Sequence, residues 1–209
     1  MSDYRTDEET VEVIGRWWRE NGTFLLVTVV LVVAGTLGWT WWQAQTQARA
    51  EGAAALYSAW ERAPASEAQA IAERLREEHP RSAYVALISL DAARRAMEAE
   101  DSVLARSALE QVLELGVSRQ IEDVARIRLA RVELDAGEPA AALARLEDVR
   151  SGVQLSLVEE LRGDALRALE REEEAVAAYE RALVTAETPR PLLRIKHEDL
   201  TGALAGGSE

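Results

Sequence analysis

The sequence contains no cysteine, and this absence removes several kinds of chemistry. Such a chain forms no disulfide and has no thiol nucleophile, no cysteine-ligated metal site and no cysteine for lipid attachment. Histidine is scarce too: His79 precedes a proline, His197 lies among charged residues, and neither has a partner at metal-ligand spacing. We expect both histidines at the surface and no bound metal.

Catalytic signatures are also missing. The sequence has no glycine-rich phosphate loop, no G-x-S-x-G and no H-E-x-x-H. The acidic run 172–174 is interpreted as a solvated turn. The tripeptide Arg162-Gly163-Asp164 resembles an adhesion motif, but it is expected inside a helix. The sequence therefore predicts neither an enzyme nor a cofactor nor a small-molecule substrate.

Positive charge is in short supply, with 24 Lys and Arg against 37 Asp and Glu, a net charge of −13. Residues 43–209 carry 31 acids and 21 bases, a net of −10. A field of this sign repels phosphate backbones, so nucleic acid is not an expected partner. Only five prolines occur, whereas alanine, leucine, arginine and glutamate are abundant, which favours helices.

One long apolar stretch dominates the chain. Residues 23–42 contain no charged side chain. At about 1.5 Å of rise per residue, a helix of this length crosses a ~30 Å hydrocarbon core. The segment is therefore predicted to be a transmembrane helix. Tryptophans at both of its ends fit the aromatic belts of the two headgroup layers. These are Trp17, Trp18, Trp39, Trp41 and Trp42.

Two other interpretations of the stretch were weighed. A buried core helix rarely remains apolar on all sides for twenty residues. A cleaved signal peptide would need a cleavage site near Ala50, which lies late, and the preceding 22 residues are acidic rather than basic. Three arginines precede the span and two follow within twenty residues, a count that slightly favours a cytoplasmic N-terminus and an exported C-terminal domain.

The segments beside the span are predicted to be helical. Residues 1–22 are interpreted as a cytoplasmic amphipathic lead-in, with a capping box from Thr6 to Glu9 and a break at Asn21-Gly22 before the span. Residues 43–51 are expected to continue the helix out of the membrane as a linker.

The remainder shows an internal period. When helical hairpins are aligned on a small residue of the second helix, Ala68, Ala105, Ala142 and Ala175 become equivalent, at intervals of 37, 37 and 33 residues. The pattern resembles a tetratricopeptide repeat and predicts an all-α fold in which hairpins stack as a right-handed solenoid, because no hairpin buries its apolar stripe alone. Glu133 stands where the motif expects an aromatic residue.

The repeat domain is predicted at residues 52–201. Its last part, 191–201, is interpreted as a capping helix in which Leu192, Leu193, Ile195 and Leu200 cover the last repeat, and 202–209 as a loose tail. The residues expected to pack between helices are Ala130, Gly137, Ala142, Leu146, Gly163, Ala175, Tyr179 and Ala182.

Stacked hairpins form a concave groove that is able to take peptide segments. Mapping the repeat pattern onto the chain predicts six residues on this inner face. They are Arg94, Met97, Arg131, Leu134, Asp164 and Arg167. The alternative, that they belong to an ordinary solvated helix surface, is equally compatible with the pattern.

In the order of its parts the chain resembles the YfgM family, whose members are ancillary subunits of the bacterial SecYEG translocon. The resemblance rests on residues 4–22, on Gly38-Trp39 with Trp42, on Leu56-Tyr57, and on segments 162–164 and 192–200. It implies a single-pass protein of the inner membrane with a periplasmic repeat domain. The implied partners are the SecYEG translocon, a membrane-anchored chaperone of the prolyl-isomerase type (PpiD) and exported polypeptides, in addition to membrane lipid.

Two functions of other classes stay open at this point. The cytoplasmic lead-in, with its paired tryptophans, could restrain a regulator of a stress response. The repeat domain, if released by cleavage near Ala50, could serve as a periplasmic scaffold for envelope assembly. Deleting residues 1–15 would test the first possibility, and the mass of the mature chain would test the second.

Overall fold

The structure, a computed structural model, describes the backbone of residues 7–150, 152 and 154–206, with side chains from Gly15 onward. Within these residues the chain is helical and has no strand, which confirms the all-α prediction. The helices are α1 (Asp7–Arg62), α2 (Ala65–Glu78), α3 (Ala83–Glu98), α4 (Ser102–Leu115), α5 (Arg119–Asp135), α6 (Pro139–Glu147), α7 (Leu155–Ala168), α8 (Glu172–Val184) and α9 (Pro191–Gly206).

The chain divides into two compact units, Met1–Gly52 and Ala53–Glu209. The first unit consists mainly of α1, the one helix of the described residues that is long and apolar enough to cross a membrane. The apolar side chains of its middle part are not covered by other parts of the chain: Phe24 is 76% and Leu31 66% exposed. The hydroxyls of Thr28 and Thr36 donate to helix carbonyls at 2.8 and 2.9 Å, so these polar groups are satisfied without water.

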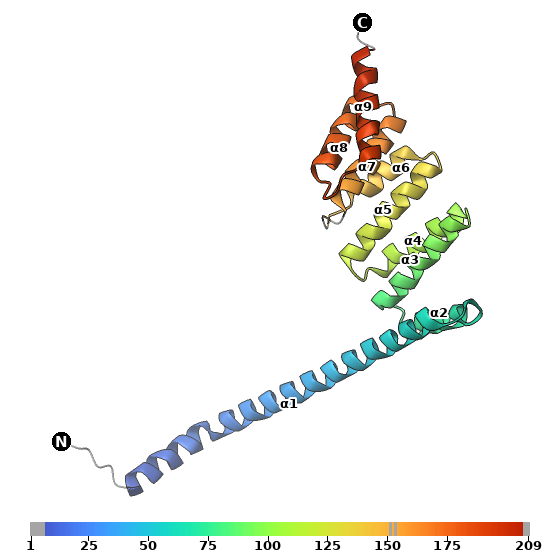
Figure 1. Ribbon diagram of the computed structural model, residues 1–209. Helices are drawn as coiled ribbons and strands as arrows, with labels where there is room; N and C mark the ends of the chain where they lie inside the picture. Colours follow the sequence, from blue (N-terminus) through green and yellow to red (C-terminus); the bar gives the residue numbers. More distant parts are fainter. Residues whose placement is uncertain (1–6, 151, 153, 207–209) are drawn as a thin grey trace, which may run out of the picture. The chain divides into compact units, whose positions relative to one another are not determined.

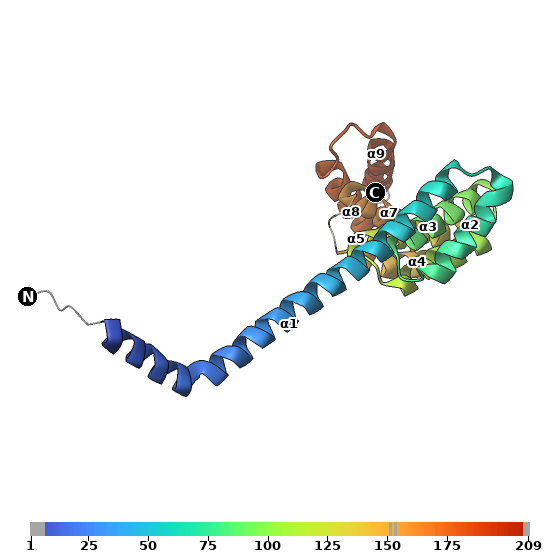
Figure 2. The ribbon, with the colours of Figure 1, turned by 90° about the horizontal axis from the view of Figure 1, so that it is seen from below.

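The break predicted at Asn21-Gly22 is wrong. Helix α1 continues through both residues, and although it bends in its blue N-terminal part, it is not interrupted (Figure 2). Asn21 donates from Nδ2 to the carbonyl of Trp17 at 3.1 Å and so supports the helix that it was expected to end. The capping box involves Thr6, which lies outside the described residues.

The second unit is a series of helical hairpins (Figure 1). The end of α1 pairs with α2, and α3–α4, α5–α6 and α7–α8 follow, with each hairpin packed on the next and α9 packed on α8. Ala68, Ala105, Ala142 and Ala175 are buried, and each is the fourth residue of its helix. In each case the backbone N–H donates to the carbonyl four residues earlier, at 3.0–3.1 Å.

The turns inside the three later hairpins also share one geometry. The middle residues Glu100, Gly137 and Glu170 have φ of 58°, 76° and 60°. In each turn, the next residue donates its N–H to the carbonyl five positions earlier, at 2.8–2.9 Å, as in a Schellman motif. The repeat is therefore present in the backbone even where the sequence pattern is weak.

Helix α9 departs from the predicted cap in two ways. It continues to Gly206, so that residues 202–206 are helical rather than loose, because the alanines and leucine at 203–205 favour helix. Leu193 and Leu200 are buried, whereas Leu192 is 66% and Ile195 51% exposed. Two of the four residues predicted to cover the last repeat are therefore buried, and the other two are exposed.

Two other local predictions are wrong. The acidic run 172–174 is the first turn of α8 rather than a loop, since negative charge is favoured at a helix N-terminus. Both histidines are half-buried rather than at the surface. His197 lies against α8, with Nε2 3.5 Å from Oε1 of Glu180.

Candidate partner-binding groove

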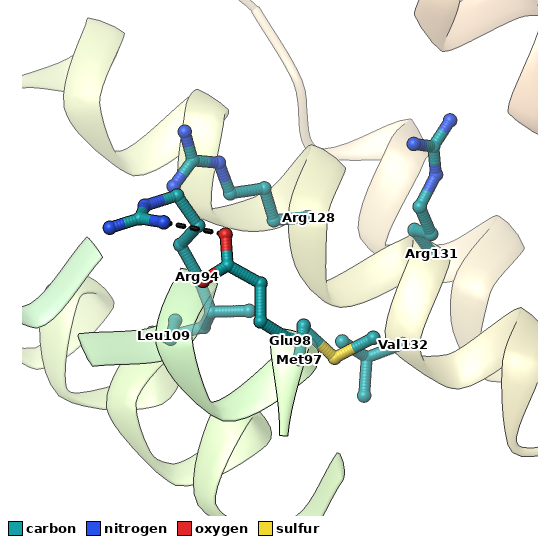
Figure 3. A pocket seen from close by; sticks show the side chains of 8 residues that line it. Arg94, Met97, Glu98, Leu109, Arg128, Arg131 and Val132 are labelled. Atoms are coloured by element: carbon teal, nitrogen blue, oxygen red, sulfur yellow. Dashed lines mark hydrogen bonds and ion pairs between the residues drawn. The ribbon is translucent and has the colours of Figure 1, made fainter. Parts of the chain in front are cut away.

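A cavity of about 440 Å³ opens between α3 and α5, with one side chain of α4 at its base (Figure 3). Its lining combines apolar side chains with arginines. The lining residues are Ala93, Arg94, Met97, Glu98, Leu109, Arg128, Arg131 and Val132. Ala93, Leu109 and Val132 are at most 2% exposed, so they form a fixed apolar floor that belongs to the core of these hairpins. Met97 packs on the same core and is only partly buried.

The structure brings three of the six predicted groove residues, Arg94, Met97 and Arg131, to this cavity. The other three lie elsewhere. Leu134 packs on the core between α5 and α6, and Arg167 is exposed on α7. Asp164 is occupied by contacts within the chain: its Oδ1 accepts from the Tyr179 hydroxyl at 2.8 Å and from Lys196 Nζ at 2.8 Å.

The sequence pattern missed several lining residues. Arg128 and Arg131 are three positions apart, so they share one helix face, and this spacing was a usable signal. Glu98 follows Met97 directly and is the last residue of α3, so the repeat pattern assigns no further inner-face position there. Leu109 belongs to α4, a second helix of a hairpin, and no signal along the chain places it at the base of a groove formed by first helices.

The arginines of the cavity differ in their partners. Arg94 is bound by two acids: Nη2 lies 2.7 Å from Oδ1 of Asp91, and Nη1 lies 2.5 Å from Oε1 of Glu98. The hydrogen bonds to Asp91 and Glu98 raise the pKa of the Arg94 guanidinium. Its charge is thus largely balanced inside the chain.

Arg128 and Arg131 on α5 carry unbalanced charge. Arg128 donates from Nη1 to the carbonyl of Leu90 at 3.2 Å, a neutral acceptor. Arg131 has no hydrogen bond or ion pair with any residue that the structure describes. In Figure 3 the side chain of Arg128 points toward Arg94, whereas that of Arg131 points away from the other labelled side chains. The wall formed by α5 is therefore cationic, in a chain whose net charge is −13.

The contact between α7 and α9 has the opposite chemistry. Lys196 on α9 lies 3.0 Å from Oε1 of Glu160 and 2.8 Å from Oδ2 of Asp164 on α7. Arg190, just before α9, pairs with Glu160 and donates to Oγ of Ser156 at 3.0 Å. Opposite charges thus join α9 and the residue before it to α7 and hold the last helix in place.

The residues predicted to pack between helices lie inside the second unit. Six of them are 0% exposed. These six are Ala130, Ala142, Leu146, Ala175, Tyr179 and Ala182. Gly137 takes the left-handed turn position, and Gly163 faces the ring of Tyr179. The predicted belt tryptophans of α1 are all exposed, from 49% for Trp17 to 70% for Trp41.

Curated relatives align with most of the chain. The ancillary SecYEG translocon subunit of Aggregatibacter actinomycetemcomitans is 29% identical over 181 residues, 84% of this chain and 88% of the relative. The subunit of the same name in Escherichia coli (strain K12) is 28% identical, over 90% of this chain and 93% of its own. That of Neisseria gonorrhoeae (strain ATCC 700825 / FA 1090) is 28% identical, over 96% and 100%.

These names confirm the resemblance to the YfgM family that the sequence pattern indicated. No solved structure gives a significant match. The model of a tetratricopeptide repeat-like domain matches residues 15–202, and since this is most of the chain, the protein belongs to that family.

Proposed function

We propose that this protein is a non-catalytic interaction module, anchored in the bacterial inner membrane, that works beside the SecYEG translocon. One observation carries the proposal: a protein named ancillary SecYEG translocon subunit aligns with 96% of the chain and with its own full length. An alignment of this extent includes both the apolar part of α1 and the hairpins. The translocon is therefore the first proposed partner.

The proposed topology places residues 1–22 in the cytoplasm, 23–42 in the bilayer and the repeat domain, 52–201, in the periplasm. The exposed apolar side chains of α1 support a lipid environment, because such a surface in water would cost about 25 cal/mol for each Å². The exposed tryptophans near both ends of the apolar stretch support it too, because tryptophan is enriched at the two membrane–water interfaces.

In this proposal the repeat domain receives segments of exported polypeptides and links the translocon to a periplasmic chaperone of the prolyl-isomerase type, PpiD. Anchoring makes weak contacts sufficient, because a tether of a few nanometres keeps the groove at an effective concentration of about 1 mM near the channel exit. The open cavity between α3 and α5 supports this role, since it offers a partner apolar surface, the guanidinium of Arg131, which has no partner among the described residues, and that of Arg128, which has only a neutral acceptor.

The test is crosslinking in native membranes with a photoreactive residue in place of Arg131. We expect capture of a translocon subunit, the chaperone or exported chains. A matched residue in place of Val184, which is 85% exposed on α8, should capture far less. Equal capture at both positions, or none of these proteins at Arg131, would contradict the proposal.

A second measurement tests the wider inner face. The double variant Arg131→Glu/Arg167→Glu should reduce recovery of the chaperone with the protein, because both arginines are exposed and their loss leaves the core unchanged. Circular dichroism should show the same helical content and melting as wild type. Undiminished recovery would count against a role for this face. External protease added to spheroplasts should digest the repeat domain if it is periplasmic.

A further inference from the structure

The cavity between α3 and α5 has arginine side chains on both walls, but only those of α5 carry unbalanced charge. Arg94 comes from α3, and Arg128 and Arg131 come from α5. Glu98, the one acid in the lining, and Asp91 outside it both pair with Arg94, so the positive charge that the cavity offers comes from Arg128 and Arg131. Between the two walls the structure gives the hydrogen bond from Arg128 to the Leu90 carbonyl but no ion pair among the described lining residues.

The contact between α7 and α9 is an internal comparison, since α9 follows the α7–α8 hairpin as α5 follows the α3–α4 hairpin. There α7 carries the acids and α9 the cation. Nζ of Lys196 lies 2.8 Å from Oδ2 of Asp164 and 3.0 Å from Oε1 of Glu160. Leu193, one turn before Lys196, is 1% exposed and packs on the core of α8. A helix with an apolar residue and a charged residue one turn apart thus docks on this stack.

The open cavity offers the reverse charge beside a similar apolar floor. Leu109 is 1% and Val132 2% exposed. Met97 has a flexible side chain that adapts to different ligands. A volume of about 440 Å³ lies within the range of about 300–1,000 Å³ that ligand sites occupy. The ligand that complements this cavity is therefore one that places an anionic group next to an apolar group.

We propose that this cavity binds a segment of another polypeptide in which an Asp or Glu lies one helical turn from a large apolar side chain. The proposal rests on the proposed function and names the partner chemistry of that same groove. The carboxylate accepts charge-assisted hydrogen bonds from Arg131, which has no partner among the described residues, and is attracted by the nearby charge of Arg128. The apolar side chain covers Met97, Leu109 and Val132.

The acidic character of the whole chain does not prevent this recognition. A net charge of −13 repels an acidic partner at long range. At physiological ionic strength, however, charges are screened over about 8 Å, so close contact with the two arginines decides the binding. Recognition is therefore selective for a local pair of groups, and strongly acidic segments without an apolar residue bind poorly.

The test uses the full chain in lipid nanodiscs and fluorescent helical peptides that are acetylated and amidated, so that side chains supply the only carboxylates. One peptide carries Asp and Leu one turn apart, a second has Asn for Asp, a third Lys for Asp and a fourth Ser for Leu. We expect the Asp–Leu peptide to bind at least about tenfold more tightly than the other three, because an ionic hydrogen bond and apolar burial are both needed.

Variants assign the effect to the cavity. Arg128→Gln/Arg131→Gln should abolish the preference for Asp over Asn and flatten the dependence on salt. Arg74→Gln/Arg194→Gln removes two exposed arginines outside the cavity, with the same change of net charge, and should leave the preference intact. Because the peptide series on the wild-type protein is independent of any variant, a folding defect would not obscure the result.

Three outcomes would overturn the inference. The first is equal binding of the Asp, Asn and Lys peptides, and the second is an equal loss of the preference for Asp in the control variant. The third is displacement of the fluorescent peptide from Arg128 and Arg131 by anionic vesicles, with no preference among the peptides. The last would assign the cavity to lipid. The proposed function is tested apart, by recovery of SecYEG with the protein. Recovery of SecYEG without peptide preference rejects only this inference, and peptide preference without SecYEG rejects only the function.

Discussion

The ring of Tyr179 lies directly against the backbone of α7 at Gly163: a Cβ atom added to Gly163 would be 2.5 Å from the ring carbon Cδ1. Unbonded carbon atoms do not approach so closely. The ring is fully buried, and its hydroxyl donates to Oδ1 of Asp164 at 2.8 Å, so it is held at both ends. The hairpin α7–α8 therefore requires glycine at this position.

Replacing Gly163 with alanine should lower the free energy of unfolding by about 1–3 kcal/mol, because the added methyl group overpacks a fixed aromatic ring. Urea denaturation of the full chain in detergent measures the change. Gly202→Ala is the matched control: it also lies in a helix, and an added Cβ meets nothing within 4 Å. The control should be neutral or slightly stabilising, and equal losses in both variants would contradict the packing argument.

The three Schellman turns give a second prediction. Glu170 adopts φ of 60°, a left-handed conformation that costs a residue with a side chain about 1–2 kcal/mol, whereas Gly137 adopts 76° without that cost. Glu170→Gly should therefore raise the free energy of unfolding by about 0.5–1 kcal/mol, part of the gain being offset by the greater freedom of glycine in the unfolded chain.

The reverse change, Gly137→Ala, should lower the free energy of unfolding by about 1 kcal/mol. Both variants alter one exposed turn position, and thermal melting followed by circular dichroism compares them directly. A stabilising Gly137→Ala, or a destabilising Glu170→Gly, would show that the left-handed turns are not what limits these hairpins.

Much of the fold was predictable because the repeat is a local pattern. A glycine or alanine at a helix crossing and an aromatic residue some 16 positions later lie within one hairpin, so Gly163 and Tyr179 could be paired without knowledge of the rest. The turn residues Glu100 and Glu170 were less visible. Their geometry is fixed by the hydrogen bonds at the ends of the helices, and glutamate gives no sign of a left-handed backbone.

The groove was less predictable because it depends on contacts between hairpins. Asp164 maps to the inner face by repeat position, yet Lys196, 32 residues later, occupies it. Periodicity assigns a face to each residue but does not say which helix covers that face. Leu109 enters the cavity from α4 for the same reason, and Ile195 remains exposed although its spacing suits a capping helix.

Tyr179 gives a prediction at alkaline pH. Burial and, next, the hydrogen bond to Asp164 raise the pKa of the Tyr179 hydroxyl above its usual value of about 10. The folded state thus favours the protonated phenol. The resulting stability is fully present below pH about 10 and is lost as the pH rises above it, because the unfolded chain then releases the proton while the folded chain retains it.

The comparison is between wild type and Tyr179→Phe in urea denaturation from neutral to alkaline pH. The variant should lose about 1 kcal/mol at neutral pH with the hydrogen bond to Asp164, and its stability should fall less steeply than that of wild type above pH about 10. Ultraviolet absorbance should show one tyrosine that ionises only when the wild-type chain unfolds. Parallel pH profiles for the two proteins would rule out the role assigned to this hydroxyl.

Glu133 occupies a position that the other hairpins fill with apolar residues. It is 1% exposed and lies three residues before the end cap of α5, where α3 has Ala96 and α7 has Leu166. One carboxylate oxygen accepts from Nε of Arg145 at 3.1 Å, but the other, Oε2, has no partner. A buried oxygen without a hydrogen bond costs about 1–3 kcal/mol.

Glu133→Leu should therefore raise the free energy of unfolding by about 1–2 kcal/mol, since leucine matches the site in α7 and Arg145 retains a second acid, Glu110, at 3.6 Å. Glu133→Gln keeps a polar group of the same shape and should gain less. Urea denaturation of the three proteins ranks them. If Glu133→Leu is the least stable, the pair with Arg145 contributes more than the unpaired oxygen costs, and the departure from the repeat pattern serves the stability of the stack.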